Sequence, residues 1–183
     1  LSVPAYLKER SSTVLDESLL PLARPLVLIH PGSGSKHKCV DPAVLASVIQ
    51  LFQTQGVVPL ILEGPADQQA VEKLLSHLSN KPPVLQGLSL SLLAGVLSRI
   101  EVFLGHDSGV THLSALLGVP TVALFGPTSP ARWAPRGPHV VVVQGEPCRC
   151  LSWGEVSRCA EKPCLQLSPE AILAACNVQE LST

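Results

Sequence analysis

Aromatic residues and net charge are both scarce in this sequence. Aromatic side chains make up 3% of the 183 residues, and 13 Lys and Arg nearly balance 14 Asp and Glu. Nucleic acids bind basic surfaces and stack their bases on aromatic rings, so this composition argues against a nucleic-acid partner. No apolar run approaches the roughly 20 residues that cross a bilayer, so we expect no transmembrane segment. Methionine is absent, and a chain without an initiator methionine is expected to be a fragment.

Cysteine is unevenly distributed, since four of the six cysteines lie close together in the sequence: Cys148, Cys150, Cys159 and Cys164. Four thiolates can hold a tetrahedral zinc ion, but the paired C-x2-C knuckles that form the stronger signature are missing. The sequence has no secretion signal, which disfavours disulfides. We therefore expect reduced, packed thiols and no metal or cofactor, with zinc at this cluster as the less favoured alternative.

Short apolar runs alternate with amphipathic segments along the chain. The expected strands are 26–29, 57–62, 82–85, 100–104, 121–125 and 139–143. The expected helices cover 42–52, 66–78, 89–98 and 109–118, with a last helix from Pro169; Asp41 and Ser168 are the predicted N-caps and Gly118 a left-handed C-cap. This rhythm predicts an α/β fold, a Rossmann-like doubly wound parallel sheet of about six strands.

Three segments lack a regular pattern. Residues 1–25 are expected to be an incoming interdomain linker with a helical turn near Lys8, and residues 26–183 the folded domain. Residues 129–138 are rich in proline, and 148–164 are expected to form an irregular loop.

The turn after the first strand carries glycines, hydroxyls and cations. Gly32 and Gly34 allow close backbone approach, Ser33 and Ser35 can donate hydrogen bonds, and Lys36 or Lys38 can neutralise an anion. The spacing matches neither a Walker A loop nor G-x-G-x-x-G. The turn is therefore either a phosphate site of another kind or an ordinary Gly/Ser surface loop.

The turn before residues 109–118 contains Asp107, Ser108 and Gly109. Asp107 or Ser108 can cap the helix, whose N-terminus attracts anions, and His112 is expected to lie partly off the buried face, together with Thr111 and Ser114. The alternative is that these residues are only caps and that His112 is an ordinary surface histidine.

A third turn follows the strand 57–62. Glu63, Gly64, Asp67 and Gln68 stand there, where a carboxylate or amide can bind ribose hydroxyls. Capping of the next helix by acidic residues is the alternative. Because the carboxyl ends of parallel strands meet at one sheet edge, all three turns are expected to lie together.

Two motifs resemble a known family. The first is His30-Pro-Gly-Ser-Gly-Ser35 with Lys38, and the second is Asp107-Ser-Gly-Val-Thr-His112 followed by LLGVPTVALFGPT and Arg132-Trp133. Together they resemble glycosyltransferase family 9, the ADP-heptose:lipopolysaccharide heptosyltransferases. The resemblance implies the C-terminal, donor-binding half of a GT-B enzyme. It also implies transfer of heptose from ADP-heptose to the lipopolysaccharide inner core with inversion. The acceptor site and the general base would lie in an N-terminal domain outside this chain.

The resemblance also implies roles for single residues. Ser33, Gly34 and Lys38 would contact the donor diphosphate, and Asp107, Ser108 and Gly109 would contact the diphosphate and the sugar. His112 would support the loop or a phosphate, while Gly64, Asp67 and Gln68 would lie by the ribose and adenine. Lys38 and Asp107 would act in catalysis by stabilising the donor and the transition state, with Lys38 and two helix N-termini balancing the charge of the departing diphosphate without a metal. The chain departs from the family's Lys-x-Trp-Pro, with Lys38-Cys39-Val40-Asp41 in its place.

Other functions stay open at this point. The chain can be a stand-alone nucleotide or phosphate sensor, or half of a nucleotide-sugar epimerase. As a heptosyltransferase domain it is expected to be cytoplasmic, with peripheral attachment to the inner membrane left open. On its own the domain is expected to bind ADP weakly and to transfer nothing.

Overall fold

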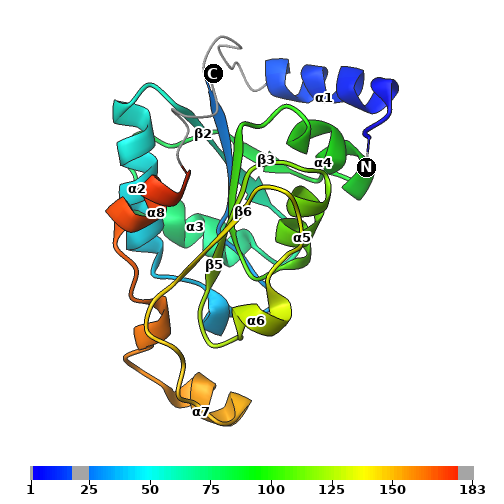
Figure 1. Cartoon of the computed structure of the whole chain (residues 1–183). Helices are drawn as coiled ribbons and strands as arrows, with labels where there is room; N and C mark the ends of the chain where they lie inside the picture. Colours follow the sequence, from blue (N-terminus) through cyan, green and yellow to red (C-terminus); the bar gives the residue numbers. More distant parts are fainter. Residues whose placement is uncertain (1, 18–24, 177–183) are drawn as a thin grey trace.

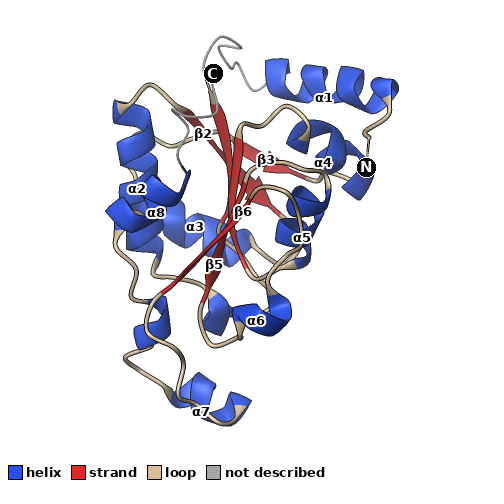
Figure 2. Cartoon of the chain, in the orientation of Figure 1, coloured by secondary structure: helices blue, strands red, loops and turns tan. Residues whose placement is uncertain are grey.

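The fold is a parallel sheet covered by helices on both faces. A computed structural model of the chain describes residues 2–17 and 25–176 (Figure 1). Six strands pair in the order β3-β2-β1-β4-β5-β6, and every pair is parallel (Figure 2). The strands are β1 Leu26–His30, β2 Val58–Glu63, β3 Val84–Gln86, β4 Val102–His106, β5 Thr121–Phe125 and β6 Val140–Gln144. The predicted Rossmann-like fold class is confirmed.

Two helical layers enclose this sheet and divide the core. α2 (Pro42–Thr54), α3 (Gln68–Ser76) and α8 (Pro169–Cys176) cover one face, and α4 (Leu90–Leu97) and α5 (Gly109–Leu116) the other (Figure 1). Successive strand residues point to opposite faces, so Ile29 packs with Phe52 while Leu28 packs with Phe103. β1, β4 and β5 are buried along their whole length. None of the described helices has the length and apolar character of a membrane span.

The predicted helix ends at Asp41, Ser168 and Gly118 are confirmed. The Asp41 side chain accepts from the backbone N–H of Ala43 at 2.8 Å, and the Ser168 hydroxyl accepts from Ala171 N at 3.1 Å. Gly118 adopts a φ of 80° directly after α5, a conformation that glycine reaches without steric cost. Local side-chain chemistry therefore sets these boundaries.

The N-terminal segment is more regular than expected. Residues Ala5–Glu17 form the thirteen-residue helix α1, where the sequence suggested a linker with one helical turn; residues 18–24 of the predicted linker lie outside the described residues. α1 packs on α4, where a Cβ at Gly95 would overlap the Leu7 carbonyl, and Arg99 donates to Ser12 at 2.9 Å. Packing against α4 stabilises this helix.

Two further segments expected to be irregular contain short helices. α6 (Pro130–Trp133) begins with proline, which the first helical turn tolerates. α7 (Trp153–Arg158) starts at the N-cap Ser152, whose hydroxyl accepts from Glu155 N at 3.3 Å, while the Glu155 carboxylate accepts from Leu151 N at 2.9 Å. The Ser-x-x-Glu spacing was visible in the sequence, so this helix was predictable. A 3-10 turn, η2 (Pro163–Leu165), follows it.

The predicted buried face of α5 is partly wrong. Thr111 and Ser114 are fully buried, whereas Leu116 is 56% exposed. The Thr111 hydroxyl donates to the His106 carbonyl, and the Ser114 hydroxyl lies 2.9 Å from that of Thr121. Small hydroxyl side chains thus fill the space between α5 and the sheet, since their polar atoms find partners there.

Candidate functional site

Three strand-to-helix turns meet where the strand order reverses between β1 and β4. Six residues there, which we call the switch-edge cluster, are joined by hydrogen bonds: His30, Ser33, Lys38, Asp67, Asp107 and Ser108. Ligands of open α/β sheets bind outside the carboxyl ends of the strands at such a reversal. The prediction that the three turns share one edge is therefore confirmed.

His30 links two of these turns from the end of β1. Its Nε2 donates to Oδ2 of Asp67 at 2.8 Å, and its Nδ1 lies 3.4 Å from the Ser108 hydroxyl. The same Asp67 oxygen accepts from Gly64 N at 3.0 Å. The hydrogen bond from His30 lowers the pKa of Asp67 below its usual value, so this buried carboxylate is ionised at neutral pH.

Gly32 is required by this arrangement. A Cβ at position 32 would overlap the Asp67 carboxylate, whereas one at Gly34 would meet no atom within 4 Å. The first glycine of the motif therefore makes room for Asp67, and the second faces open space.

Lys38 and Asp107 join the first turn to the third. Lys38 Nζ lies 2.8 Å from Oδ2 of Asp107, and the Ser33 hydroxyl donates to the Asp107 carbonyl at 2.8 Å. The side chain of Asp107 is 8% exposed and that of Lys38 22%. Ser33 and Lys38 are thus both bound to Asp107, and the aspartate balances the lysine charge.

The predicted cap of α5 is not formed. Ser108 occupies the N-cap position but makes no capping hydrogen bond, because its hydroxyl contacts Thr111 at 3.1 Å and His30 instead. Asp107 is bound to Lys38. Gly109 is exposed, and a Cβ there would meet no atom within 4 Å. No side-chain cap therefore shields the first N–H groups of α5, and such groups attract anions.

The remaining predicted residues lie around the cluster without joining it. Ser35 accepts from His37 N at 3.3 Å and caps η1 (Lys36–Lys38). Gln68 is exposed and donates to Glu72 at 3.1 Å along α3. His112 is exposed on α5, and Glu63 is half-buried at the end of β2.

Two histidines, His30 and His106, support these turns, although neither was assigned a role from the sequence. His106 ends β4, beside the end of β1, and its Nε2 accepts from Val40 N at 3.1 Å. Burial lowers the pKa of His106 to about 4, so it is neutral at physiological pH. His30 likewise supports the turns, through Asp67 and Ser108. Both histidines could have been found in the sequence, because each one ends an apolar strand.

The four clustered cysteines lie in the segment that follows β6. A hydrogen bond with Cys148, followed by burial, raises the pKa of Cys150 to about 11, and burial raises that of Cys164 to about 11. All six cysteines are free. Within residues 2–17 and 25–176, no group of three or more His, Cys, Asp or Glu side chains is arranged to hold a metal ion.

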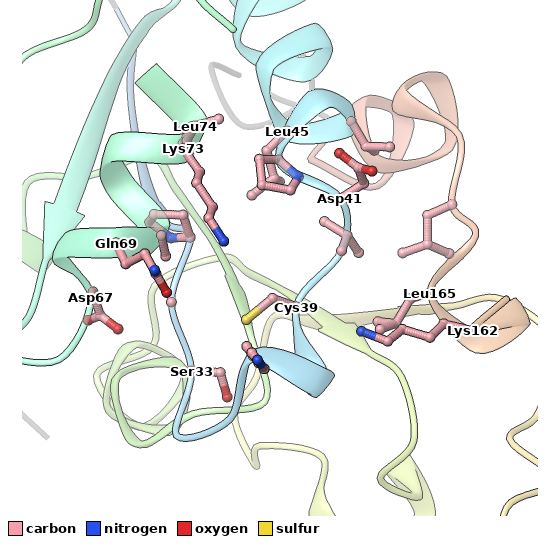
Figure 3. Close-up of a pocket in the computed structure, with 18 of the residues that line it drawn as sticks. Ser33, Cys39, Asp41, Leu45, Asp67, Gln69, Lys73, Leu74, Lys162 and Leu165 are labelled. Carbon is pink, nitrogen blue, oxygen red and sulfur yellow. The ribbon is translucent and has the colours of Figure 1, made fainter. Parts of the chain in front are cut away.

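A cavity of about 950 Å³ lies between α2, α3 and the segment 160–168 (Figure 3). Ser33 and Asp67 of the switch-edge cluster reach its wall, whereas Lys38, Asp107 and Ser108 do not line it. The structure therefore has two neighbouring polar regions.

The doubly wound sheet, with the cluster at its switch point, defines a Rossmann-like α/β domain. The family model of glycosyltransferase family 9 (heptosyltransferase) matches residues 2–160. The chain belongs to this family, as its two motifs suggested.

Relatives with assigned names cover part of the chain. Lipopolysaccharide heptosyltransferase 3 of Escherichia coli is 29% identical over 113 residues, which are 60% of this chain and 33% of that protein. Lipopolysaccharide heptosyltransferase 1 of Pseudomonas aeruginosa is 42% identical over 65 residues, 36% of this chain and 18% of that protein. The chain thus matches about a third or less of the length of either relative.

Solved structures share the fold over about half their length. A glycosyl transferase family 9 protein from Veillonella parvula matches 100% of this chain and 54% of its own, with a TM-score of 0.86 and 23% identity. ADP-heptose lipopolysaccharide heptosyltransferase II of E. coli gives a TM-score of 0.82 at 19% identity and the same coverage. E. coli heptosyltransferase WaaC, solved with ADP, gives 0.60 at 21% identity, covering 81% of this chain and 47% of its own.

Proposed function

We propose that residues 26–183 are the nucleotide-sugar donor domain of an inverting heptosyltransferase that transfers heptose from ADP-heptose to the lipopolysaccharide inner core. Residues 1–25 then lead in from an acceptor-binding domain outside this chain. Membership of family 9, the names of the relatives and the ADP-bound WaaC structure support this donor and acceptor. The single observation that carries the proposal is the contact of Ser33, Lys38 and Asp107 beside the uncapped start of α5.

The diphosphate of the donor would lie on the N-terminus of α5, against Ser108, Gly109 and the 33–38 turn. The free N–H groups of the helix and the Lys38 ammonium would then stabilise the negative charge that develops as the bond from sugar to diphosphate breaks. Lys38 would exchange its contact with Asp107 for one with a phosphate oxygen. Asp107 would then be free to accept a hydrogen bond from a sugar hydroxyl, so both would act in catalysis.

The nucleoside would lie beside the second turn. Both hydrogen bonds to Asp67 use Oδ2, which leaves Oδ1 for a ribose hydroxyl. Glu63, Gly64 and Gln68 border the same turn, and Gly34, Ser35 and His112 would complete the edge of the donor site. Asp67 would thus have two tasks, since it also holds His30 in place.

The general base that deprotonates the acceptor would come from the acceptor domain, as in the sequence-based hypothesis. Because this chain would lack the base, it should bind ADP without transferring sugar. Cytoplasmic location, with or without peripheral contact to the inner membrane, stays a prediction of the same hypothesis.

Isothermal titration of the 183-residue chain with ADP, ADP-heptose and a UDP-sugar tests the donor assignment. We expect ADP and ADP-heptose to bind and Lys38→Met to weaken both at least about tenfold, which corresponds to about 1.4 kcal/mol. Lys81→Met, an exposed lysine outside the cluster, is the matched control and should leave the affinity unchanged. Equal ADP binding by wild type and Lys38→Met would refute the site.

The stand-alone sensor is distinguished by a second measurement. If the chain is a donor domain, mixing it with ADP-heptose and a lipopolysaccharide acceptor should give no product until the acceptor domain is supplied in the same polypeptide. No observation in the described structure favours the epimerase alternative.

A further inference from the structure

The cavity between α2 and α3 has its own chemistry. Its wall comes from the 31–45 segment, from α3 and from residues 160–168 (Figure 3). Among the residues proposed to bind the donor, Ser33 and Asp67 line it, while Lys38, Asp107, Ser108 and Gly109 do not. The cavity is therefore a separate hollow that shares one edge with the donor site.

Three lysines from three different segments line this cavity, which we call the lysine cavity: Lys36, Lys73 and Lys162. Figure 3 shows the side chains of Lys73 and Lys162 reaching into the hollow from opposite walls. The ion pairs of the described residues are His30–Asp67 and Lys38–Asp107, so none of the three lysines is paired within the described chain. The same wall also carries three carboxylates, those of Asp41, Asp67 and Glu161.

Two of these carboxylates are held by hydrogen bonds from the protein. Asp67 is bound to His30 and to Gly64 N. Asp41 is exposed and accepts from Ala43 N as the N-cap of α2. Glu161 is exposed beside Lys162 in the sequence. Asp41 and Asp67 are thus engaged by hydrogen bonds from the protein itself, whereas the three lysines are not.

The Cys39 thiol lies in the cavity between Lys73 and Lys162 (Figure 3). Burial is the main cause that raises the pKa of Cys39 to about 11, the Asp67 charge raises it further, and the nearby Lys162 and Lys38 charges act in the opposite direction. Cys39 is therefore a neutral thiol at physiological pH and supplies no counter-charge.

The backbone at Lys162 is unusual. Lys162 has φ 42° and ψ 57°, and it is the one non-glycine residue with positive φ in the part of the chain that the structure describes. Side chains rarely adopt this conformation, and it often marks a functional position. Here it lies directly before η2 and directs the lysine to the cavity.

The rest of the wall is apolar. Leu45, Leu74 and Leu165 are buried and line the cavity. A volume of about 950 Å³ lies in the range of small-molecule sites, which combine apolar walls with a few polar groups. A ligand for this hollow would therefore carry an anionic group and a compact body that packs on leucine side chains.

We propose that the lysine cavity is a second binding site, separate from the donor site, for a small phosphorylated molecule. Its phosphate would sit between the ammonium groups of Lys73 and Lys162, with Lys36 at the side, and its body would pack on Leu45, Leu74 and Leu165. Phosphate suits this geometry because its two charges and several oxygens can be shared by flexible lysines approaching from different directions. This inference does not depend on the proposed glycosyltransferase activity.

Titration calorimetry with inorganic phosphate and with glucose 6-phosphate tests the second site on the 183-residue chain. The variants are Lys73→Met/Lys162→Met for the cavity, Lys38→Met for the donor site and Lys81→Met as the surface control. We expect the double variant to lose at least about tenfold in affinity for glucose 6-phosphate while ADP binding changes less than about twofold. Lys38→Met should instead weaken ADP binding and leave the affinity for glucose 6-phosphate nearly unchanged.

Alkylation of Cys39, followed by peptide mass spectrometry, gives a second measurement at the site itself. Glucose 6-phosphate should slow alkylation of Cys39 in the wild type and in Lys38→Met, but not in Lys73→Met/Lys162→Met. Equal affinity of wild type and double variant for both phosphates, or Cys39 protection that survives the double change, would overturn the second site. Loss of ADP binding in Lys38→Met alone would still support the donor site, so the two proposals can fail separately.

Discussion

The switch-edge cluster and the lysine cavity lie side by side but differ in whether their cationic side chains are paired. In the cluster, His30 and Lys38 are bound to Asp67 and Asp107, so the turns are held together by the protein's own ion pairs. In the cavity, Lys36, Lys73 and Lys162 have no such partner among the described residues. The cluster is thus ordered before a ligand arrives, whereas the positive charge of the cavity is available to one.

The largest expected effect comes from adding a methyl group inside the cluster. Gly32→Ala places a Cβ on the Asp67 carboxylate, which must move and release His30. We expect about 3 kcal/mol of destabilisation and loss of ADP binding, because overpacking and a broken buried pair act together. Gly34→Ala, where the added Cβ meets no atom, is the control. Urea unfolding of both variants measures the difference, and equal stability would contradict the role given to Gly32.

Neutralising one lysine from each region compares them directly. Lys38→Met leaves the nearly buried Asp107 unpaired and should lower the free energy of unfolding by about 2 kcal/mol. Lys73→Met removes an exposed, unpaired cation, and its effect should stay within about 0.5 kcal/mol. Thermal and urea unfolding at low salt measure both. Similar losses would mean that the two regions do not differ in pairing.

His106 connects the two regions, because it holds the backbone of Val40, which lines the cavity. Its pKa is about 4 in the folded state against 6.5 for the unperturbed side chain. The unfolded state therefore takes up a proton first as pH falls, and stability contributed by His106 is lost between pH 6.5 and about 4. At pH 5 the loss should be about 2 kcal/mol.

Urea unfolding at pH 7.5 and pH 5 measures this change. Asp67 does not add to this change, because the stability from its lowered pKa is lost only as pH falls below the unperturbed value of 3.8. His106→Gln keeps an acceptor for Val40 N but cannot titrate, so it should remove the His106 part of the slope. If the free energy of unfolding of His106→Gln falls between pH 7.5 and pH 5 as much as that of the wild type, other groups cause the pH dependence.

The smallest effect is expected at Ser108. Ser108→Ala removes the contacts with Thr111 and His30 and should cost about 0.5–1 kcal/mol. If the hydroxyl also binds the donor, ADP affinity should fall while glucose 6-phosphate binding in the lysine cavity stays the same. A parallel fall of both affinities would show that the two regions are coupled.

Most of the fold could be predicted from local sequence patterns, and the candidate site could be predicted in part. Apolar runs located the strands, and Asp41, Ser168 and Gly118 marked helix ends by their own chemistry. The motifs identified Ser33, Lys38 and Asp107, which do meet. The Lys38–Asp107 pair and the missing cap of α5 were not predictable, because both result from contacts between residues about seventy positions apart. α1 was missed because its stability comes from α4.

The sequence by itself determined the parallel sheet, the edge at which its turns gather and the family to which the chain belongs, because strand periodicity, turn residues and motifs are local properties. The tertiary structure alone decided which charges are paired and which are left free. Pairing depends on distances between side chains from different elements, and only the folded chain sets those distances. For this reason the switch-edge cluster could be anticipated from its residues, whereas the lysine cavity could not.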